Sequence, residues 1–276
     1  MRKVIGMGET ILDILFKNRQ PVAAVPGGSS FNAIISTGRV GVPCHFIGST
    51  GADEVGQMIV DFMHANGVST QYFEQTEEKS AVSLAFLDEA GDAHYSFYKP
   101  SVKCPGEKSH PAFAQDDVLL VGSYYACCQP MHPFVEAVMD EAVRSGAILY
   151  YDLNFRRGHA HELPVLLPVI EQNMKQSTIV RGSADDFEVM YGMRNAEEIY
   201  RNHVSQHCQL FICTSGAEDI TICTPGGIYK YPVTPIPDVV STVGAGDNFN
   251  AGMACAMIWQ GVLREQLPAL GKDGWL

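Results

Sequence analysis

The sequence predicts an α/β fold with a mainly parallel central sheet. Between residues 118 and 214, short β-rich apolar runs alternate with segments of helical length and periodicity. Repeated strand-then-helix units of this kind place parallel strands in one sheet and helices on its faces. The composition agrees, because 276 residues with 46% hydrophobic and 18% charged side chains can form a sizeable core without disordered tracts.

The individual elements follow from apolar periodicity and from the Gly, Pro and Asn clusters that separate them. The expected strands are 4–8, 22–25, 45–48, 81–87, 94–98, 118–121, 148–153, 178–180, 210–214, 219–224 and 228–232. The expected helices are one that ends near residue 40, then 55–66, 131–145, 163–175, 184–191, 196–206 and 248–260. Residues 262–276 are expected to form a frayed end, because they hold Pro268 and two late glycines.

One hairpin interrupts the alternation. Strands 81–87 and 94–98 flank Asp88-Glu89-Ala90-Gly91-Asp92, which is typical of a hairpin turn. A two-stranded hairpin is marginal by itself, so we expect it to form a small sheet with the segment near residues 20–25 and to cover a cleft. We therefore expect a single domain over residues 1–276, with a β lid from segments about 11–26 and 80–100.

Charge and composition exclude several classes of function. The net charge of −12 and the scattered Lys and Arg argue against nucleic acid as a partner. No apolar run has the length of a signal peptide core or a membrane span, so we expect a cytoplasmic protein without a membrane partner. The eight cysteines form no C-x-x-C pair, which argues against a zinc site or a disulfide framework.

The segment Ser241–Phe249 combines a glycine loop, a carboxylate and a helix start. Gly244 and Gly246 let a ligand approach the main chain, and the first N–H groups of the helix have no acceptor within it. Together with the helix dipole, the loop Gly244-Ala245-Gly246 is suited to a phosphoryl group. Asp247 would repel that group unless a metal or an acidic substrate proton lies between them, which predicts phosphoryl transfer with Asp247 as the proton acceptor. The alternative is a plain turn and a helix-stabilising acid.

The first quarter of the chain holds a second group of candidates. Glu9 and Asp13 lie beyond the first strand, where α/β proteins bind ligands. Pro26-Gly27-Gly28 leads into a helix, and Asn32 could bind sugar hydroxyls. Both sets have an alternative reading as solvated loop or helix residues. No G-x-G-x-x-G or P-loop motif is present.

Five motifs in sequence resemble the PfkB (ribokinase-like) carbohydrate kinases, particularly the fructokinase and 2-keto-3-deoxygluconate kinase branch. They are Pro26-Gly27-Gly28 with Asn32, Gly48-Ser49-Thr50-Gly51-x-Asp53-x-x-Gly56, Asp152-x-Asn154-x-Arg156, Thr214-Ser215-Gly216 and Ser241-Thr242-x-Gly244-Ala245-Gly246-Asp247. The resemblance covers almost the whole chain. It implies a ribokinase-like three-layer α/β/α sandwich with a small β lid that closes on the sugar and often mediates dimerisation.

The resemblance also implies roles for individual residues. Asp247 matches the catalytic base, and Gly244, Ala245 and Gly246 match the anion hole. The residues that it places at the sugar are Asp13, Gly27, Gly28, Asn32 and Arg156, and those that it places at ATP are Ser183, Thr214, Gly216, Gly244 and Gly246. Asp186 stands where relatives carry a glutamate that helps to hold hydrated Mg²⁺.

Three departures from the family pattern bear on function. Ser241 replaces an aspartate that contributes to a monovalent-cation site in relatives, so the resemblance does not carry that requirement over. Asp219 stands where a glycine is common. The sequence ends soon after the helix that begins near Asp247, whereas relatives continue with a helix and strand that help to wall the adenine pocket.

The favoured hypothesis is an ATP-dependent, Mg²⁺-requiring kinase that phosphorylates a primary hydroxyl of a small sugar, with fructose as the first choice. An alternative acceptor is 2-keto-3-deoxygluconate, ribose or a nucleoside. A hypothesis of another class is a sugar- or nucleotide-binding protein without catalysis, because the adenine pocket would be open. A homodimer formed through the β lid is also expected from the resemblance.

Overall fold

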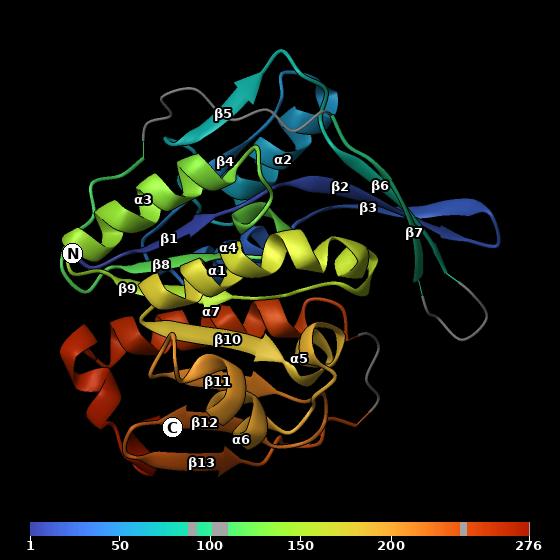
Figure 1. The fold of residues 1–276 in the computed structure, drawn as a ribbon. Helices are drawn as coiled ribbons and strands as arrows, with labels where there is room; N and C mark the ends of the chain where they lie inside the picture. The colour runs from blue at the N-terminus through green and yellow to red at the C-terminus, as the bar shows by residue number, and fades with distance from the viewer. Residues whose placement is uncertain (88–92, 101–109, 238–241, 276) are drawn as a thin grey trace.

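A nine-stranded sheet forms the centre of the molecule (Figure 1). The structure is a computed structural model that describes residues 1–87, 93–100, 110–237 and 242–275. The strand order is β13-β12-β11-β10-β9-β8-β1-β4-β5; β12 is antiparallel to both β11 and β13, and the remaining pairs are parallel. The strands are β1 (Val4–Met7), β4 (Cys44–Gly51), β5 (Phe73–Thr76), β8 (Val118–Gly122), β9 (Ile148–Asp152), β10 (Ile179–Ser183), β11 (Phe211–Thr214), β12 (Ile220–Thr224) and β13 (Gly227–Tyr231).

Helices cover both faces of this sheet, which confirms the predicted three-layer sandwich (Figure 1). One face carries α3 (His132–Arg144), α4 (Leu163–Gln176), α5 (Ala184–Tyr191) and α6 (Ala196–Ile199), and the other carries α1 (Ser29–Arg39), α2 (Glu54–Ala65) and α7 (Ala245–Trp259). Successive strand residues point to opposite faces. Leu149 and Tyr151 therefore join the first core, whereas Ile148 and Tyr150 join the second. Within the described ranges, no helix has the length and apolarity needed to cross a bilayer.

The segments predicted to form the β lid make up a second, four-stranded sheet. Its strands are β2 (Ile11–Lys17), β3 (Gln20–Gly27), β6 (Val82–Leu87) and β7 (Ala93–Tyr98), in the order β3-β2-β6-β7. The sheet extends from the side of the molecule at which the parallel strands end (Figure 1). The predicted hairpin turn, residues 88–92, lies outside the described residues.

Two elements in the body differ from the prediction. The edge strand β5 was not expected, because its sequence Phe-Glu-Gln-Thr has no apolar alternation and its position is set by backbone pairing with β4. The helix expected over 196–206 is short: α6 ends at Ile199, and the π-helical segment Tyr200–Val204 follows. The N–H of Ser205 donates to the carbonyl of Tyr200, five residues back.

The expectation of a frayed end was wrong. Residues Arg264–Ala269 and Lys272–Trp275 form 3₁₀ helices, and Leu267 and Trp275 are buried against the sheet face covered by α7. The hydroxyl of Tyr231 on β13 donates to the carbonyl of Lys272 at 2.6 Å. These two widely spaced apolar residues gave no periodic signal, although each finds a place in the core.

Two further 3₁₀ segments, Tyr124–Ala126 and Arg157–Glu162, follow β8 and β9. They lie on the same side as the ends of the parallel strands, because each begins within a few residues of its strand's last residue. The connections from β8 to α3 and from β9 to α4 are therefore longer than a simple tight turn.

Candidate active site

Three strand ends and the predicted glycine loop meet at the carboxyl edge of the central sheet. Asp152, Ser183 and Thr214 are the last residues of the neighbouring strands β9, β10 and β11. The loop that leads into α7 lies beside them, since Gly246 packs against the side chain of Arg181 from β10. Carboxyl ends of parallel strands are the usual ligand-binding edge of an open α/β sheet.

The start of α7 has the geometry of an anion site. Gly244 adopts a left-handed conformation with φ of 78°, which a residue with a side chain rarely adopts, and Ala245 then begins the helix. Among the described residues, no side chain caps this helix. The first-turn N–H groups and the helix dipole are thus directed toward whatever lies in front of the loop.

Asp247 is held by α1. The hydroxyl of Ser29 donates to Oδ1 of Asp247 at 3.0 Å, and Nδ2 of Asn32 donates to Oδ2 at 2.8 Å. The pKa of Asp247 is raised, chiefly by burial and further by the charge of Asp152. The hydrogen bonds from Asn32 and Ser29 and the charge of Arg156 act in the opposite direction. Asn32, which the sequence predicts at the sugar, contacts this carboxylate directly.

The predicted sugar-binding glycines pack against two acidic residues. A Cβ on Gly28, whose φ is 128°, would lie 2.3 Å from the carbonyl oxygen of Glu9. A Cβ on Gly27 would lie 2.7 Å from Oδ2 of Asp13. Burial raises the pKa of Asp13, while the hydroxyl of Ser83, which donates to this carboxylate, lowers it. Gly28 is therefore required for the main chain to pass this close to Glu9, whereas a side chain at Gly27 would displace the carboxylate of Asp13.

Two cations balance these acids. Lys99, just after β7 of the lid, donates to both carboxylate oxygens of Glu9 at 2.9 Å. Arg156 is exposed after β9, and its charge lowers the pKa of both Asp247 and Tyr95 of the lid. The predicted sugar side thus holds two carboxylates and two cations.

The predicted ATP-side residues follow β10 and β11. Ser183 and Asp186 form a capping box at the start of α5: Oγ of Ser183 accepts from the N–H of Asp186 at 3.1 Å, and Oδ2 of Asp186 accepts from the N–H of Ser183 at 2.6 Å. Burial raises the pKa of Asp186, as does the charge of Asp152. The hydroxyl of Thr214 accepts from Arg181, and Gly216 has a φ of 56°, as a tight turn requires.

Comparison with known proteins decides the family. Residues 6–267 match the family described as pfkB family carbohydrate kinase. The chain belongs to the pfkB family. Its relatives include an aminoimidazole riboside kinase of Salmonella typhimurium, 26% identical over 92% of this chain and 80% of the relative, and a fructokinase of Rhizobium leguminosarum bv. trifolii, 26% identical over 98% and 84%.

Solved structures agree with the fold of this pfkB kinase. The fructokinase of Vibrio cholerae O395 with fructose, ADP and calcium bound has a TM-score of 0.87 at 20% identity and covers 100% of this chain and 89% of that one. The aminoimidazole riboside kinase of Salmonella enterica with its riboside and an ATP analog has a TM-score of 0.84 at 21% identity and covers 99% and 90%. The predicted fold class and the predicted enzyme class, an ATP-dependent carbohydrate kinase, are confirmed.

Metal donors at the carboxyl edge of this pfkB kinase are few. In the described part of the chain, no three His, Cys, Asp or Glu residues cluster closely enough to hold a metal ion. Mg²⁺ usually keeps several waters and takes one or two carboxylates together with substrate phosphates. Asp186, with one oxygen engaged by its own capping box, fits an ion held through water. Ser241, the substituted monovalent-cation position, lies outside the described residues.

Three contributors to the site were not identified as site residues from the sequence. Ser29 directly follows the Gly27-Gly28 pair, but nothing local shows that its partner is 218 positions away. Arg181 is a cation within an otherwise apolar strand, which is a usable signal because buried charges require partners. Lys99 follows the second strand of the predicted hairpin, and its partner Glu9 is 90 positions away.

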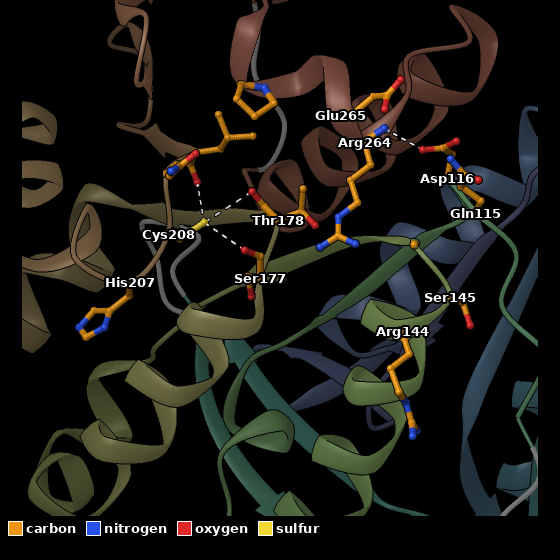
Figure 2. A pocket seen from close by; sticks show the side chains of 14 residues that line it. Gln115, Asp116, Arg144, Ser145, Ser177, Thr178, His207, Cys208, Arg264 and Glu265 are labelled. Atoms are coloured by element: carbon orange, nitrogen blue, oxygen red, sulfur yellow. Dashed lines mark hydrogen bonds between the residues drawn. The ribbon is translucent and has the colours of Figure 1, made fainter.

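A cavity of about 650 Å³ lies at the opposite edge of the sheet (Figure 2). It is lined by residues that precede the strands, among them Asp116 before β8, Gly146 before β9, Thr178 before β10 and Leu210 before β11, and Arg264 extends toward it (Figure 2). None of the predicted site residues lines this cavity.

Proposed function

We propose that this pfkB kinase transfers the γ-phosphate of ATP to a primary hydroxyl of a small neutral sugar, with fructose as the favoured acceptor. The observation that carries the proposal is the position of Asp247, held by Ser29 and Asn32 in the first turn of α7 beside the Gly244–Gly246 loop. A proton acceptor and an anion-binding helix start are thus adjacent, as phosphoryl transfer to a hydroxyl requires.

Asp247 serves as the general base. Its ionised carboxylate accepts the proton of the sugar hydroxyl while the O–P bond forms and the bond to ADP breaks. The raised pKa makes this carboxylate a stronger base than an exposed aspartate, and the hydrogen bonds from Ser29 and Asn32 fix its orientation. The main-chain N–H groups of the first turn of α7, at Ala245, Gly246 and Asp247, bind oxygens of the transferred phosphoryl group.

ATP is proposed to lie along the ends of β10 and β11. Ser183, Thr214 and Gly216 follow these adjacent strands, and the glycine loop borders them. When bound, Mg²⁺ would neutralise charge on the nucleotide phosphates, and Asp186 would hold one of its waters. Solved neighbours that contain ADP or an ATP analog support ATP as the phosphoryl donor.

The charge balance under the lid favours a neutral sugar. Glu9 engages Lys99 through both carboxylate oxygens, and Asp13 and Arg156 contribute opposite charges nearby. Among the side chains assigned to the sugar side, a sugar acid would then depend on Arg156 alone for its countercharge, in the presence of Asp13 and Asp247. We assign Asp13, Gly27, Gly28, Asn32 and Arg156 to the sugar side. The fructokinase relatives and the fructose-bound neighbour support fructose.

A riboside is the second candidate acceptor. The observation that favours it is the aminoimidazole riboside kinase relative, which matches this chain at the same 26% identity as a fructokinase. Ribose, another nucleoside and 2-keto-3-deoxygluconate are further members of the test panel.

The test is a coupled ADP-release assay with ATP and Mg²⁺ across fructose, ribose, 2-keto-3-deoxygluconate, aminoimidazole riboside and another nucleoside. We expect the largest kcat/KM with fructose. Turnover with a riboside alone would replace the sugar assignment and keep the kinase. Sugar binding measured by calorimetry without ADP release from any acceptor would contradict the proposal and favour a binding protein without catalysis.

The assembly and location that we propose follow from two further observations. The lid exposes Phe97 and Tyr98, each at 60% or more, which suits contact between the lids of two copies. Sedimentation equilibrium should give a dimer in the wild type and a monomer after Phe97→Lys.

All described cysteines are free, which agrees with a location in the cytoplasm, where ATP is also available.

A further inference from the structure

Arg181 is a buried cation at the centre of the carboxyl edge. Only 6% of it is exposed, although it lies on β10 between apolar neighbours. Its Nη1 donates to Oδ1 of Asp152 on β9 at 3.0 Å, and its Nη2 donates to Oγ1 of Thr214 on β11 at 2.7 Å. One side chain therefore connects the ends of three adjacent strands.

The guanidinium of Arg181 also lies directly beneath the glycine loop. A Cβ added to Gly246 would be 2.9 Å from Nη2 and 3.3 Å from Nη1, which is closer than ordinary packing allows. The guanidinium carbon lies 6.0 Å from the ring centre of Phe249 in the same helix. The loop thus packs against the guanidinium, and a side chain at position 246 would displace it.

Asp152 extends the connection into α7. Its second oxygen, Oδ2, accepts from Nδ2 of Asn250 at 2.7 Å, and Oδ1 of Asn250 accepts from the hydroxyl of Tyr150 at 3.1 Å. All four side chains, including Arg181, are buried. The start of α7 is therefore fixed from the sheet side by one polar network.

The same network acts on the charge of Asp247. The groups that face Asp247 are Ser29 and Asn32 from α1, Asp152 from the end of β9 and Arg156 after it. The charge of Asp152 raises the pKa of Asp247, and Arg181 lies within hydrogen-bonding distance of Asp152. Removal of either member of this ion pair leaves the charge of the other uncompensated near the proposed base.

We propose that Arg181 is a positioning residue: it holds the Gly244–Asp247 loop in place for phosphoryl transfer and offsets the charge of Asp152 beside Asp247. This role rests on the proposed function, because it acts through the base and the anion-binding loop. Arg181 does not itself contact the reacting groups.

Turnover is the first readout. We expect Arg181→Met to lower kcat by about 10²-fold, the size of effect that a small misplacement of catalytic groups can cause, with little change in the KM for the sugar. Arg181→Lys should lose less, because it keeps the charge but not the two-point contact. Arg157→Met, at an exposed arginine after β9, is the control and should keep wild-type turnover. Normal kcat in folded Arg181→Met would overturn the proposal.

The pH profile distinguishes this role from plain support of the fold. In Asp152→Asn the buried guanidinium stays charged without its partner, so the acid limb of kcat/KM should move to lower pH by about 0.5–1 unit. The double variant Asp152→Asn with Arg181→Met removes both charges, and the limb should return to its wild-type position while kcat stays low. An unmoved limb in Asp152→Asn would contradict the electrostatic part, even if Arg181→Met failed to fold.

Failure of the proposed function would be visible separately. If the wild type turned over no acceptor, the kinase proposal would fail, but the inference about Arg181 could still be tested. Carbon-13 NMR of the Asp247 carboxyl in the wild type and in Asp152→Asn should show the same downward change of its pKa without any turnover. No change in that titration would reject the charge coupling.

Discussion

The two edges of the central sheet both contain buried ionic side chains, but they use them differently. At the amino edge, Asp117 is fully buried immediately before β8. It accepts from Nζ of Lys3 at 2.6 Å and from the N–H groups of Lys3 and Ala114, each at 2.9 Å. A carboxylate with a paired cation and two main-chain donors needs nothing further to be stable in the core.

At the carboxyl edge, the described residues place three carboxylates, those of Asp152, Asp186 and Asp247, near one buried guanidinium, that of Arg181. Asp152 pairs with Arg181, and burial raises the pKa of both Asp186 and Asp247. Such incomplete compensation costs stability and is typical of functional sites rather than structural ion pairs. The difference between the edges therefore indicates which charges serve the chemistry.

The largest expected effect is a loss of turnover when Asp247, at the carboxyl edge, is replaced. Asp247→Asn should lower kcat by about 10²–10⁴-fold, the usual contribution of a general base. Its stability should not fall at neutral pH, because the folded-state pKa of Asp247 is raised above 3.8 and the ionised form is unfavourable there. Any increase in the free energy of unfolding relative to the wild type should vanish as the pH falls below 3.8, because Asp247 is then protonated in both the folded and the unfolded wild type. Coupled assays and thermal melts across pH would show both effects, and near-normal turnover would reject the base.

Asp117→Ala should give the reverse result at the amino edge. Loss of the carboxylate leaves the Lys3 ammonium and two main-chain N–H groups without their acceptor, so the free energy of unfolding should fall by about 3–5 kcal/mol. The kcat/KM at a temperature where the variant is folded should not change. Urea denaturation and the ADP-release assay check the two parts, and a loss of kcat/KM without a loss of stability would contradict the comparison.

A smaller effect should follow from Ser29→Ala. Removal of one donor from Asp247 raises the pKa of this carboxyl, so the acid limb of kcat/KM should move to higher pH by about 0.5–1 unit. Ser36→Ala is a matched control, because Ser36 joins the same two helices through Asn248 at 2.6 Å without contacting Asp247. Equal shifts in both variants would point to helix packing instead of the hydrogen bond.

The smallest expected effect is a change in the preference of the enzyme between two sugar acceptors. Glu9→Gln releases Lys99 from its ion pair, so kcat/KM for 2-keto-3-deoxygluconate relative to fructose should rise by about fivefold or less, as for a partly exposed pair. Adding Lys99→Met to this variant should abolish the rise. The ratio of the two kcat/KM values is the measurement, and an unchanged ratio would remove Lys99 from the account of specificity.

The sequence was informative where the signal is local. The alternation of strands and helices gave the architecture, and the glycines before Asp247 fixed the start of α7 within a few residues. The partners of that acid could not be derived, because Ser29 and Asn32 are 218 and 215 positions away and become neighbours only when α1 packs on α7. The burial of Leu267 and Trp275 was not predicted for a different reason: isolated apolar residues create no hydrophobic periodicity in the sequence.

The attachment of Asp247 to α1 has a consequence for how the enzyme would work. Ser29 and Asn32 belong to α1, which packs on the central sheet, and not to the four-stranded sheet, so closure of the proposed cover would leave the alignment of the proton acceptor unchanged. An incoming molecule would then meet an already assembled reaction centre. The swing of the cover would decide how long it stays and how well water is kept out, and leakage of phosphate to water should be the first symptom of a loosened cover.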